Sequence, residues 1–422
     1  MPTYGDRTEE NSVPPAWVVG GGVLPFGLVV GFTITALPFL LTHAGVPLGR
    51  VAATSAIVMS PTFWGFLLQP LMDTGLTRRA YCWLTAAAAA GCIGLALWLL
   101  SPAHLAATTA LLLAAELAIV LYSGAISGWT ADFTPDAMRG RVSGWTNVAN
   151  LGGGALGSLA VMSLAPRLGM HTLGVGLGAC ILAGVAPTLW FPPPGRSAFH
   201  FTEIFTSALK TVWRVSRTPA CLTGFALFLA PASAEAAINL FSGLGDPFHT
   251  SAATVIWVTG AGVAISTSLG ALLGGYAADR LPRAALYLGA GAATGLLSVT
   301  MAFAPRAPWV YIAGVLFYNG LAGIAYAAFN ALGYQIVGQN NAVASTQLGL
   351  FAASTNFAIV YMTWSDGQGF QHFGVRGMML TDGGAAIIAG TLLWWLLGRR
   401  LGHPASALAP TAALPSDLPS AP

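Results

Sequence analysis

The chain has 422 residues, of which 55% are hydrophobic and only 7% are charged, and its formal net charge is +3. Soluble domains carry roughly 25% charged residues, so this composition excludes an ordinary soluble protein and predicts an integral membrane protein. Nucleic-acid binding is not expected, because the basic residues stand singly or in pairs instead of in clusters. The four cysteines show no metal-ligand spacing, and we expect neither a metal nor a cofactor.

Twelve apolar runs, each close to or above the roughly 20 residues that cross a bilayer, follow one another along the chain. The first six cover residues 17–42, 51–71, 80–100, 103–131, 142–164 and 173–191. The second six cover residues 221–244, 252–278, 284–304, 309–337, 342–364 and 378–397. We therefore predict an all-α membrane protein with twelve transmembrane helices in two six-helix halves.

This pattern also predicts the domain organisation. The linker carries apolar residues at helical spacing, with Lys210, Arg214 and Arg217 on the other side, which is typical of an amphipathic helix at the membrane surface. The expected domains are a polar tail (1–15), a six-helix bundle (16–191), the linker (192–219), a second six-helix bundle (220–400) and a disordered tail (401–422).

Two turns repeat one pattern, at residues 65–79 (GFLLQPLMDTGLTRR) and 270–283 (GALLGGYAADRLPR). In each, an apolar run ends at an aspartate, and arginines follow before the next run begins. These residues are Asp73, Arg78 and Arg79 in the first turn and Asp279, Arg280 and Arg283 in the second. The repetition indicates a duplicated architecture with two matching halves.

Basic residues define the orientation, because Lys and Arg accumulate on the cytoplasmic side of membrane proteins. With both termini inside, all but four of the 17 Lys and Arg residues lie on one side. The exceptions are Arg50, Arg167, Arg306 and Arg376. We expect a protein of the bacterial inner membrane whose termini and two repeated turns are cytoplasmic.

Six plus six spans, a long middle loop and matching turns after the second span of each half resemble the major facilitator superfamily of secondary transporters. The resemblance covers about residues 16–400. It implies that Asp73 braces the start of span eleven, that Asp279 braces the start of span five, and that these contacts close the cytoplasmic side. The implied gate comprises Asp73, Arg78, Arg79, Asp132, Arg139, Arg141, Asp279, Arg280 and Arg283. In the alternative interpretation, the arginines only set the topology through their charge.

Three further stretches resemble the AmpG-like peptide and acetyl-coenzyme-A transporter branch of that superfamily. They are LQPLMD at 68–73, the acid and proline at 132–135 followed by Arg-Gly at 139–140, and Ser-Thr-Gln at 345–347. This resemblance implies a muropeptide-like sugar-peptide as substrate. The chain departs from the branch at Ser123 and Ser127, where hydroxyls replace the usual acids of span four.

Two acids fall in the middle of apolar runs, where a charge costs on the order of 3 kcal/mol on insertion scales. Glu116 shares a helical stripe with Ser123 and Ser127, and Glu235 precedes Asn239 by one helical turn. Because desolvation favours the protonated form of a carboxyl, both are candidate proton carriers. The alternative is a neutral glutamate that only bonds a neighbouring helix.

Span ten carries the most regular polar stripe, which is expected either to line a central cavity or to bond neighbouring helices. Its members are Asn319, Gly323, Tyr326, Asn330 and Tyr334. Span five contributes Asn150 and the glycines Gly153, Gly154 and Gly157, which are typical of close helix packing. A phosphate-binding loop is not expected there, because no strand precedes the glycines.

These observations predict a monomeric secondary transporter that imports a medium-sized polar solute with protons as the coupling ion. A sugar-peptide is the leading substrate, and a siderophore is the alternative. A membrane-embedded enzyme is disfavoured because no embedded catalytic cluster is visible, and a receptor is disfavoured because the polar tail is too short for an output domain.

Overall fold

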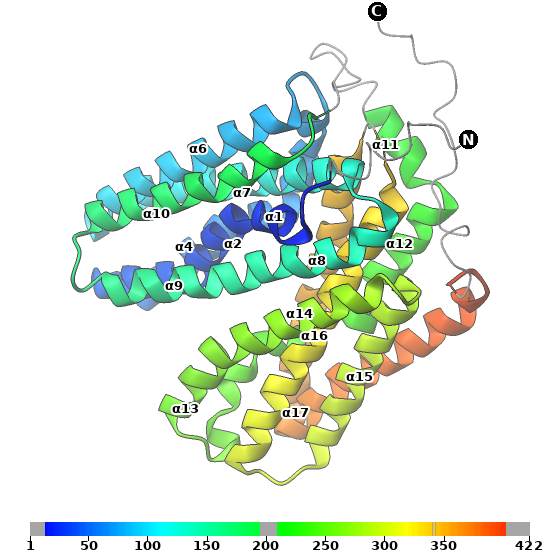
Figure 1. The fold of residues 1–422 in the computed structure, drawn as a ribbon. Coiled ribbons are helices and arrows are strands. Elements are labelled where there is room, and N and C mark those ends of the chain that lie inside the picture. Colours follow the sequence, from blue (N-terminus) through cyan, green and yellow to red (C-terminus); the bar gives the residue numbers. More distant parts are fainter. Residues whose placement is uncertain (1–12, 195–208, 340, 342, 402–422) are drawn as a thin grey trace, which may run out of the picture. The chain divides into compact units, whose positions relative to one another are not determined.

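The computed structural model describes residues 13–194, 209–339, 341 and 343–401, and these parts of the chain form helices without any strand (Figure 1). Most of the two predicted tails and residues 195–208 of the predicted linker lie outside the described residues. The later part of the linker forms α11 (Leu209–Ser216).

Nine helices among the described residues are long and apolar enough to cross a membrane. They are Ala16–His43, Gly49–Asp73, Arg78–Trp98, Pro102–Phe133, Met170–Trp190, Ala252–Ala278, Arg283–Phe303, Pro308–Val337 and Ala344–Leu397. Large apolar side chains on these helices remain exposed, among them Trp17, Phe317 and Trp395, as expected of surfaces that face lipid.

The last of these helices, α17 (Ala344–Leu401), has 58 residues and would be about 87 Å long if straight. That length is nearly three times the roughly 30 Å hydrocarbon thickness of a bilayer. Gly374 interrupts it with φ 62°, a left-handed conformation that only glycine adopts readily. The helix therefore consists of two arms, which correspond to the predicted spans eleven and twelve.

Two further predicted spans take a different form. Span five is continuous from α8 (Arg139–Asn147) through a π-helical turn (η6, Val148–Gly152) to α9 (Gly153–Leu164). Span seven begins as α12 (Pro219–Leu229), but residues 231–248 form a series of short 3₁₀ turns. A continuous helix across 221–244 was therefore the wrong prediction, because Pro231 and the left-handed backbone of Glu235 (φ 47°) end it. With the two arms of α17, the helical segments are consistent with twelve spans.

The chain divides into two compact units, and each includes a short segment from the opposite half of the chain. The first unit comprises 1–135, 149–212 and 339–349, and the second comprises 136–148, 213–338 and 350–422. The start of span five thus belongs to the second unit, and the start of span eleven belongs to the first.

In the first unit, α6, α7 and α10 pack side by side, and α2 packs on α9 (Figure 1). A Cβ added at Gly27 would lie 2.6 Å from the carbonyl oxygen of Ala149, and one at Gly154 would lie 2.8 Å from that of Gly27. The close helix packing predicted for the span-five glycines is therefore confirmed. The elements are α1 (Ala16–Gly21), α2 (Leu24–Gly31), η2 (Phe32–Ala36), α3 (Leu37–His43), α4 (Leu48–Met59), α5 (Pro61–Trp64), η3 (Gly65–Asp73), α6 (Arg78–Trp98), η4 (Pro102–His104), α7 (Leu105–Phe133), α9, α10 (Met170–Val185) and η7 (Ala186–Trp190).

In the second unit, α16 packs on α14, α15 and α8 (Figure 1). Its core gathers aromatic and methionine side chains, including Phe241, Phe248, Tyr311, Tyr318 and Met378. The elements are η5 (Asp136–Met138), α8, α12, η10 (Pro231–Ser233), η11 (Ala236–Asn239), η12 (Phe241–Leu244), η13 (Asp246–Phe248), α13 (Ala252–Trp257), η14 (Val258–Gly262), α14 (Val263–Ala278), α15 (Arg283–Phe303), α16 (Pro308–Val337) and the greater part of α17.

Candidate functional site

The first repeated turn is built by local sequence signals. The stretch 68–73 lies in the 3₁₀ helix η3, which contains Pro70 and ends at Asp73. Gly75 supplies the left-handed residue of the turn (φ 73°). Thr77 then caps α6, because its hydroxyl accepts a hydrogen bond from the amide of Ala80 at 3.3 Å. Asp73 and the first residue of α6, Arg78, are thereby brought together.

Asp73 is buried and caps the start of α17 within the first unit. Its Oδ1 accepts from the amide of Ser345 at 3.1 Å, and its Oδ2 accepts from the amide of Thr346 at 3.0 Å and from the Thr346 hydroxyl at 2.8 Å. These amides belong to the first turn of a helix, where N–H groups lack partners within the helix and the dipole favours an anion. Asp73 is therefore held by three donors of a segment 272 positions away.

Arg78 joins this cap to two other segments. It bonds Asp73 Oδ1 at 3.1 Å, forms an ion pair with Asp132, and donates to the carbonyls of Gly128 and Asn341 at 3.2 and 3.3 Å. The guanidinium thus uses its several donors on oxygens from α7, η3 and the segment that leads into α17.

Arg79 points elsewhere. It donates to the carbonyl of Phe191 at 2.9 Å, and its guanidinium lies 5.3 Å from the ring centre of Trp129. Of the arginines in the first turn, only Arg78 contacts the aspartate cap.

The second repeated turn makes a matching cap within the second unit. Asp279 Oδ1 accepts from the amide of Gly140 at 2.6 Å, and Oδ2 accepts from the amide and the Nε of Arg141 at 3.1 and 2.8 Å. These residues form the first turn of α8. Gly140 has no room for a side chain, since an added Cβ would lie 2.6 Å from Asp279 Oδ1.

Asp136, at the turn before α8, is the centre of a second ion-pair group that the sequence did not indicate. Its Oδ1 lies 2.7 Å from Arg283 Nη1 and 3.2 Å from Arg139 Nη1. Partial burial raises the pKa of Asp136, but the hydrogen bond and charge of Arg283, together with the charge of Arg139, hold that pKa below its ordinary value. Arg280 is exposed, and among the described residues its side chain donates to the Tyr276 carbonyl of the preceding helix and not to Asp136.

The two caps are the contacts implied by the family resemblance. In both, one aspartate carboxylate accepts two backbone N–H groups from the first turn of a helix that belongs to the other half of the sequence. Hydrogen bonds of this type are formed without covalent change and can therefore be broken and remade. A gating role for them stays a proposal.

Glu116 lies fully buried in α7 of the first unit. Its Oε2 accepts from the hydroxyl of Thr33 at 3.2 Å, and its Oε1 has no hydrogen-bond partner among the described residues. Thr33 belongs to the π-helical turn η2, a kind of helix defect that is often found at functional sites. Ser123 and Ser127 follow on the same helix and are half-buried.

Glu235 is also buried, in the broken part of span seven in the second unit. Its Oε1 accepts from Thr294 at 3.4 Å, and its Oε2 has no hydrogen-bond partner in the described parts of the chain. Asn239 does not share a helical face with it, because the intervening backbone is not α-helical. Asn239 is exposed and donates to Thr363 at 3.0 Å.

The span-ten stripe lies on α16, as expected, but its members have different surroundings. Asn319 is buried and donates to the Val315 carbonyl of its own helix at 2.9 Å. Gly323 packs closely on α14, at Thr267. Tyr326 and Asn330 are half-buried, and Tyr334 is buried. Asn150 of the first unit is half-buried on the π-helical turn η6.

The structure brings forward three buried polar residues that the sequence interpretation left out. Gln69 of the LQPLMD stretch donates to the carbonyl of Val120 at 2.9 Å, which ties η3 to α7. Asp366 and Asp382 lie on the two arms of α17 and are 0% and 5% exposed. Intramembrane acids are a signal of function, but Asp366 falls between the predicted spans at 342–364 and 378–397.

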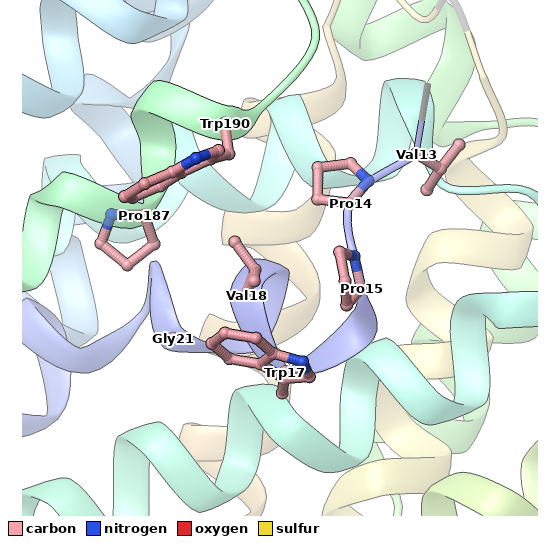
Figure 2. A pocket seen from close by; sticks show the side chains of 8 residues that line it. All are labelled: Val13, Pro14, Pro15, Trp17, Val18, Gly21, Pro187 and Trp190. Atoms are coloured by element: carbon pink, nitrogen blue, oxygen red, sulfur yellow. The ribbon is translucent and has the colours of Figure 1, made fainter. Parts of the chain in front are cut away.

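A cavity of about 620 Å³ opens at the beginning of span one in the first unit (Figure 2). It is lined by Val13, Pro14, Pro15, Trp17, Val18, Gly21, Pro187 and Trp190. The two tryptophans border it from α1 and η7 (Figure 2). The described residues of its lining are all apolar, so they offer apolar contacts.

No family model matches the sequence, and no curated protein matches it. Solved structures, however, match over nearly the whole chain. The human organic anion transporter MFSD10 has a TM-score of 0.67 at 18% identity, with 92% of this chain and 100% of that chain covered. The proton:xylose symporter XylE has a TM-score of 0.69 at 12% identity, with 90% and 94% covered. A bacterial homologue of the iron transporter ferroportin, in an outward-facing state, has a TM-score of 0.68 at 16% identity, with 91% and 99% covered.

These similarities show that the chain has the major facilitator fold, as the order of spans and the repeated turns predicted. With the nine long apolar helices among the described residues, the chain is a multi-pass membrane protein. Because the sequence identities are below 20%, these similarities establish the fold but do not identify the solute.

Proposed function

We propose that this protein is a secondary active transporter that moves a polar solute across the membrane by alternating access. The observation that carries the proposal is the pair of aspartate caps, Asp73 on the start of α17 and Asp279 on the start of α8. Such caps stabilise one arrangement of helices with contacts that are released in another. The proposed cytoplasmic gate consists of the two caps and the residues that bond to them or to the adjacent ion pairs, which are Arg78, Asp132, Arg139, Arg141 and Arg283. Arg79 and Arg280 belong to the same two turns and flank the gate through other contacts.

The proposed coupling ion is the proton. Glu116 and Glu235 are buried in different units, and each has one carboxylate oxygen without a hydrogen-bond partner among the described residues. Burying an ionised carboxylate without sufficient partners costs several kcal/mol, so both side chains are suited to take up and release a proton as their surroundings change. Transport of a solute is then linked to the proton gradient.

The proposed solute is a medium-sized polar molecule, and a muropeptide-like sugar-peptide is the first candidate. The support is the sequence pattern at 68–73, 132–140 and 345–347, which resembles the AmpG-like branch. Three members of this pattern, Asp73, Asp132 and Ser345, lie together at the cap on α17. The proposed solute contacts are Ser123, Ser127, Asn150, Asn239, Asn319, Tyr326, Asn330 and Tyr334. A siderophore is the alternative solute.

The proposed setting is the bacterial inner membrane, with both termini cytoplasmic and a monomer as the working form. The proposed domains are two six-helix bundles at 16–191 and 220–400, joined by the linker at 192–219. The N-terminal (1–15) and C-terminal (401–422) tails flank them. The arginines of the caps support this orientation, since basic residues favour the cytoplasmic side.

Uptake into cells tests the proposal. Cells that produce the protein are given a labelled muropeptide or a labelled ferric siderophore, with and without an uncoupler. The proposal expects one of the two labels to accumulate above cells without the protein, and it expects the uncoupler to abolish that excess. Uptake of neither label would reject both named solutes, and uptake that is insensitive to the uncoupler would reject proton coupling.

A further inference from the structure

The second unit contains a pair of acids that the proposed function does not use. Asp366 lies on the first arm of α17 and Asp382 lies on the second arm, and they are 0% and 5% exposed. Buried aspartates are rare in membrane spans unless they pair with other groups or bind a cation. Their surroundings therefore indicate what they bind.

Glycines bring the two arms of α17 close together. Gly374 reverses the direction of the chain with its left-handed backbone. A Cβ added at Gly369 would lie 2.9 Å from the Gly377 carbonyl oxygen and 2.6 Å from the Thr381 hydroxyl. Asp366 is about one turn from Gly369, and Asp382 follows Thr381, so this contact places the two aspartates on adjoining turns of the two arms.

Asp382 lies in a cradle of hydroxyl donors. Ser298 of α15 donates to its Oδ2 at 2.6 Å, and the Tyr318 hydroxyl of α16 lies 3.1 Å from both carboxylate oxygens. Ser298 and Tyr318 are both buried. Hydroxyl donors of this kind stabilise an ionised carboxylate.

Asp366 has the opposite surroundings. Neither of its carboxylate oxygens has a hydrogen-bond partner among the described residues. The titratable groups that interact with it are Asp382 and Tyr318. The arginines of the same region are used elsewhere, since Arg306 donates to backbone carbonyls at 3.2 and 3.4 Å and Arg376 lies over the ring of Phe303. A negative charge at Asp366 would therefore be uncompensated.

A proton fits this pair better than a metal ion. In the parts of the chain that the structure describes, no group of three His, Cys, Asp or Glu side chains is placed to hold a metal. A single proton bound to Asp366 removes its uncompensated charge and leaves Asp382 with its donors. Two carboxyls in unequal surroundings divide the roles of acid and base in this way.

The same helix connects the pair to Glu235. Thr294 and Ser298 lie one turn apart on α15, and they donate to Glu235 and Asp382, respectively. The Tyr318 hydroxyl of α16 lies on the same carboxylate as Ser298, at 3.1 Å from both oxygens of Asp382. Donors to both acids thus lie one turn apart on α15.

We propose that Asp366 and Asp382 form a proton-binding site that exchanges its proton with Glu235 through the hydroxyls of Thr294, Ser298 and Tyr318. This inference rests on the proposed proton coupling and extends it to the two arms of α17. In each exchange, an O–H bond of Asp366 or Asp382 breaks, each relaying hydroxyl accepts one proton as it gives up another, and an O–H bond of Glu235 forms, so no electron donor or acceptor is required.

Infrared difference spectroscopy of the protein in lipid vesicles, between high and low pH, tests the inference without a solute. The protonated aspartate has a carbonyl stretching band that the carboxylate lacks. We expect the part of this band that comes from Asp366 to disappear in Asp366→Asn. In Asp382→Asn, we expect that part to remain and the pH at which it is half lost to change. Asp246→Asn, which removes an exposed acid of the same unit, should leave the Asp366 part of the band intact. An unchanged band in Asp366→Asn overturns the proposal.

Two further outcomes distinguish the possible failures. If sodium chloride, but not choline chloride, removes the Asp366 part of the band at constant pH, the site binds sodium and the proposal of a proton-binding site is wrong. Ser298→Ala should shift the midpoint of Asp382 without removing any carboxyl, which provides a second test if Asp366→Asn fails to fold. If the Asp366 part of the band is lost as expected but transport does not depend on the uncoupler, the site exists and the proposed coupling fails.

Discussion

Replacing Asp73 with asparagine measures the strength of the cap on α17. Asp73 Oδ2 accepts two hydrogen bonds, from the amide and the hydroxyl of Thr346, and Oδ1 accepts from Ser345 and Arg78. If asparagine keeps its oxygen on the Arg78 side, its NH₂ group replaces Oδ2, where the Thr346 hydroxyl can rotate to accept from it but the Thr346 amide cannot. The hydrogen bond from this amide to a charged group is then lost, so the cap weakens by about 2 to 3 kcal/mol.

A loss of this size corresponds to on the order of 100-fold in the local opening equilibrium. Hydrogen–deuterium exchange, read on a peptide that contains Ser345 and Thr346, should accelerate by that factor in Asp73→Asn. Asp246→Asn, at an exposed position, is the matched control and should leave the peptide unchanged. If the amides of the α17 start exchange at the same rate in both variants, the cap does not hold the helix start and the reasoning fails.

Three other substitutions examine the second unit. The pKa of Asp136 is lowered, so its interaction with Arg283 contributes stability above the ordinary pKa of about 4, and this contribution is lost as the pH falls through the lower folded-state pKa. The free energies of unfolding of the wild type and Asp136→Asn should therefore differ at neutral pH, by less than about 1 kcal/mol because the side chain is 54% exposed. The two free energies should converge in acid, and a difference that persists there would disprove the assignment. Gly140→Ala should lower the thermal midpoint because its Cβ would meet backbone, whereas Gly289→Ala has nothing within 4 Å and should not; equal midpoints would contradict the packing argument. Arg280→Ala should shift the midpoint by less than about 2 °C, and a larger shift would show a contact beyond its single bond to Tyr276.

The fold could be predicted largely from the sequence because two signals reinforce each other. The lengths of the apolar runs define the spans, and the repetition of the Asp73 turn at Asp279 indicates that the two halves of the chain share one architecture. Gly153, Gly154 and Gly157 were recognised as packing residues, since nothing near them suited a phosphate. The caps on α17 and α8 were expected only through the family resemblance, because residues 272 positions apart give no local sign of their contact.

Span seven and the junction of spans eleven and twelve show where hydropathy stops being informative. Hydropathy records the burial of side chains and does not report the backbone conformation, so the stretch from Pro231 to Leu244 read as a helix although its backbone breaks at Glu235. Asp366 lies just after the predicted end of span eleven, so hydropathy assigns it to a loop. Its burial depends on the second arm of α17 and on Gly374, which no local pattern indicated.

Proton-driven uptake into vesicles tests the central claim most directly. Purified protein is reconstituted into liposomes, and uptake of the solute identified in cells is followed with and without an inward proton gradient. The account predicts that the gradient drives accumulation in the wild type, and that Glu116→Gln and Glu235→Gln reduce accumulation and alter its pH profile. Accumulation that does not depend on the proton gradient would contradict the claim that buried carboxyls couple transport to protons. The same holds if the pH profile of accumulation is unchanged in both variants.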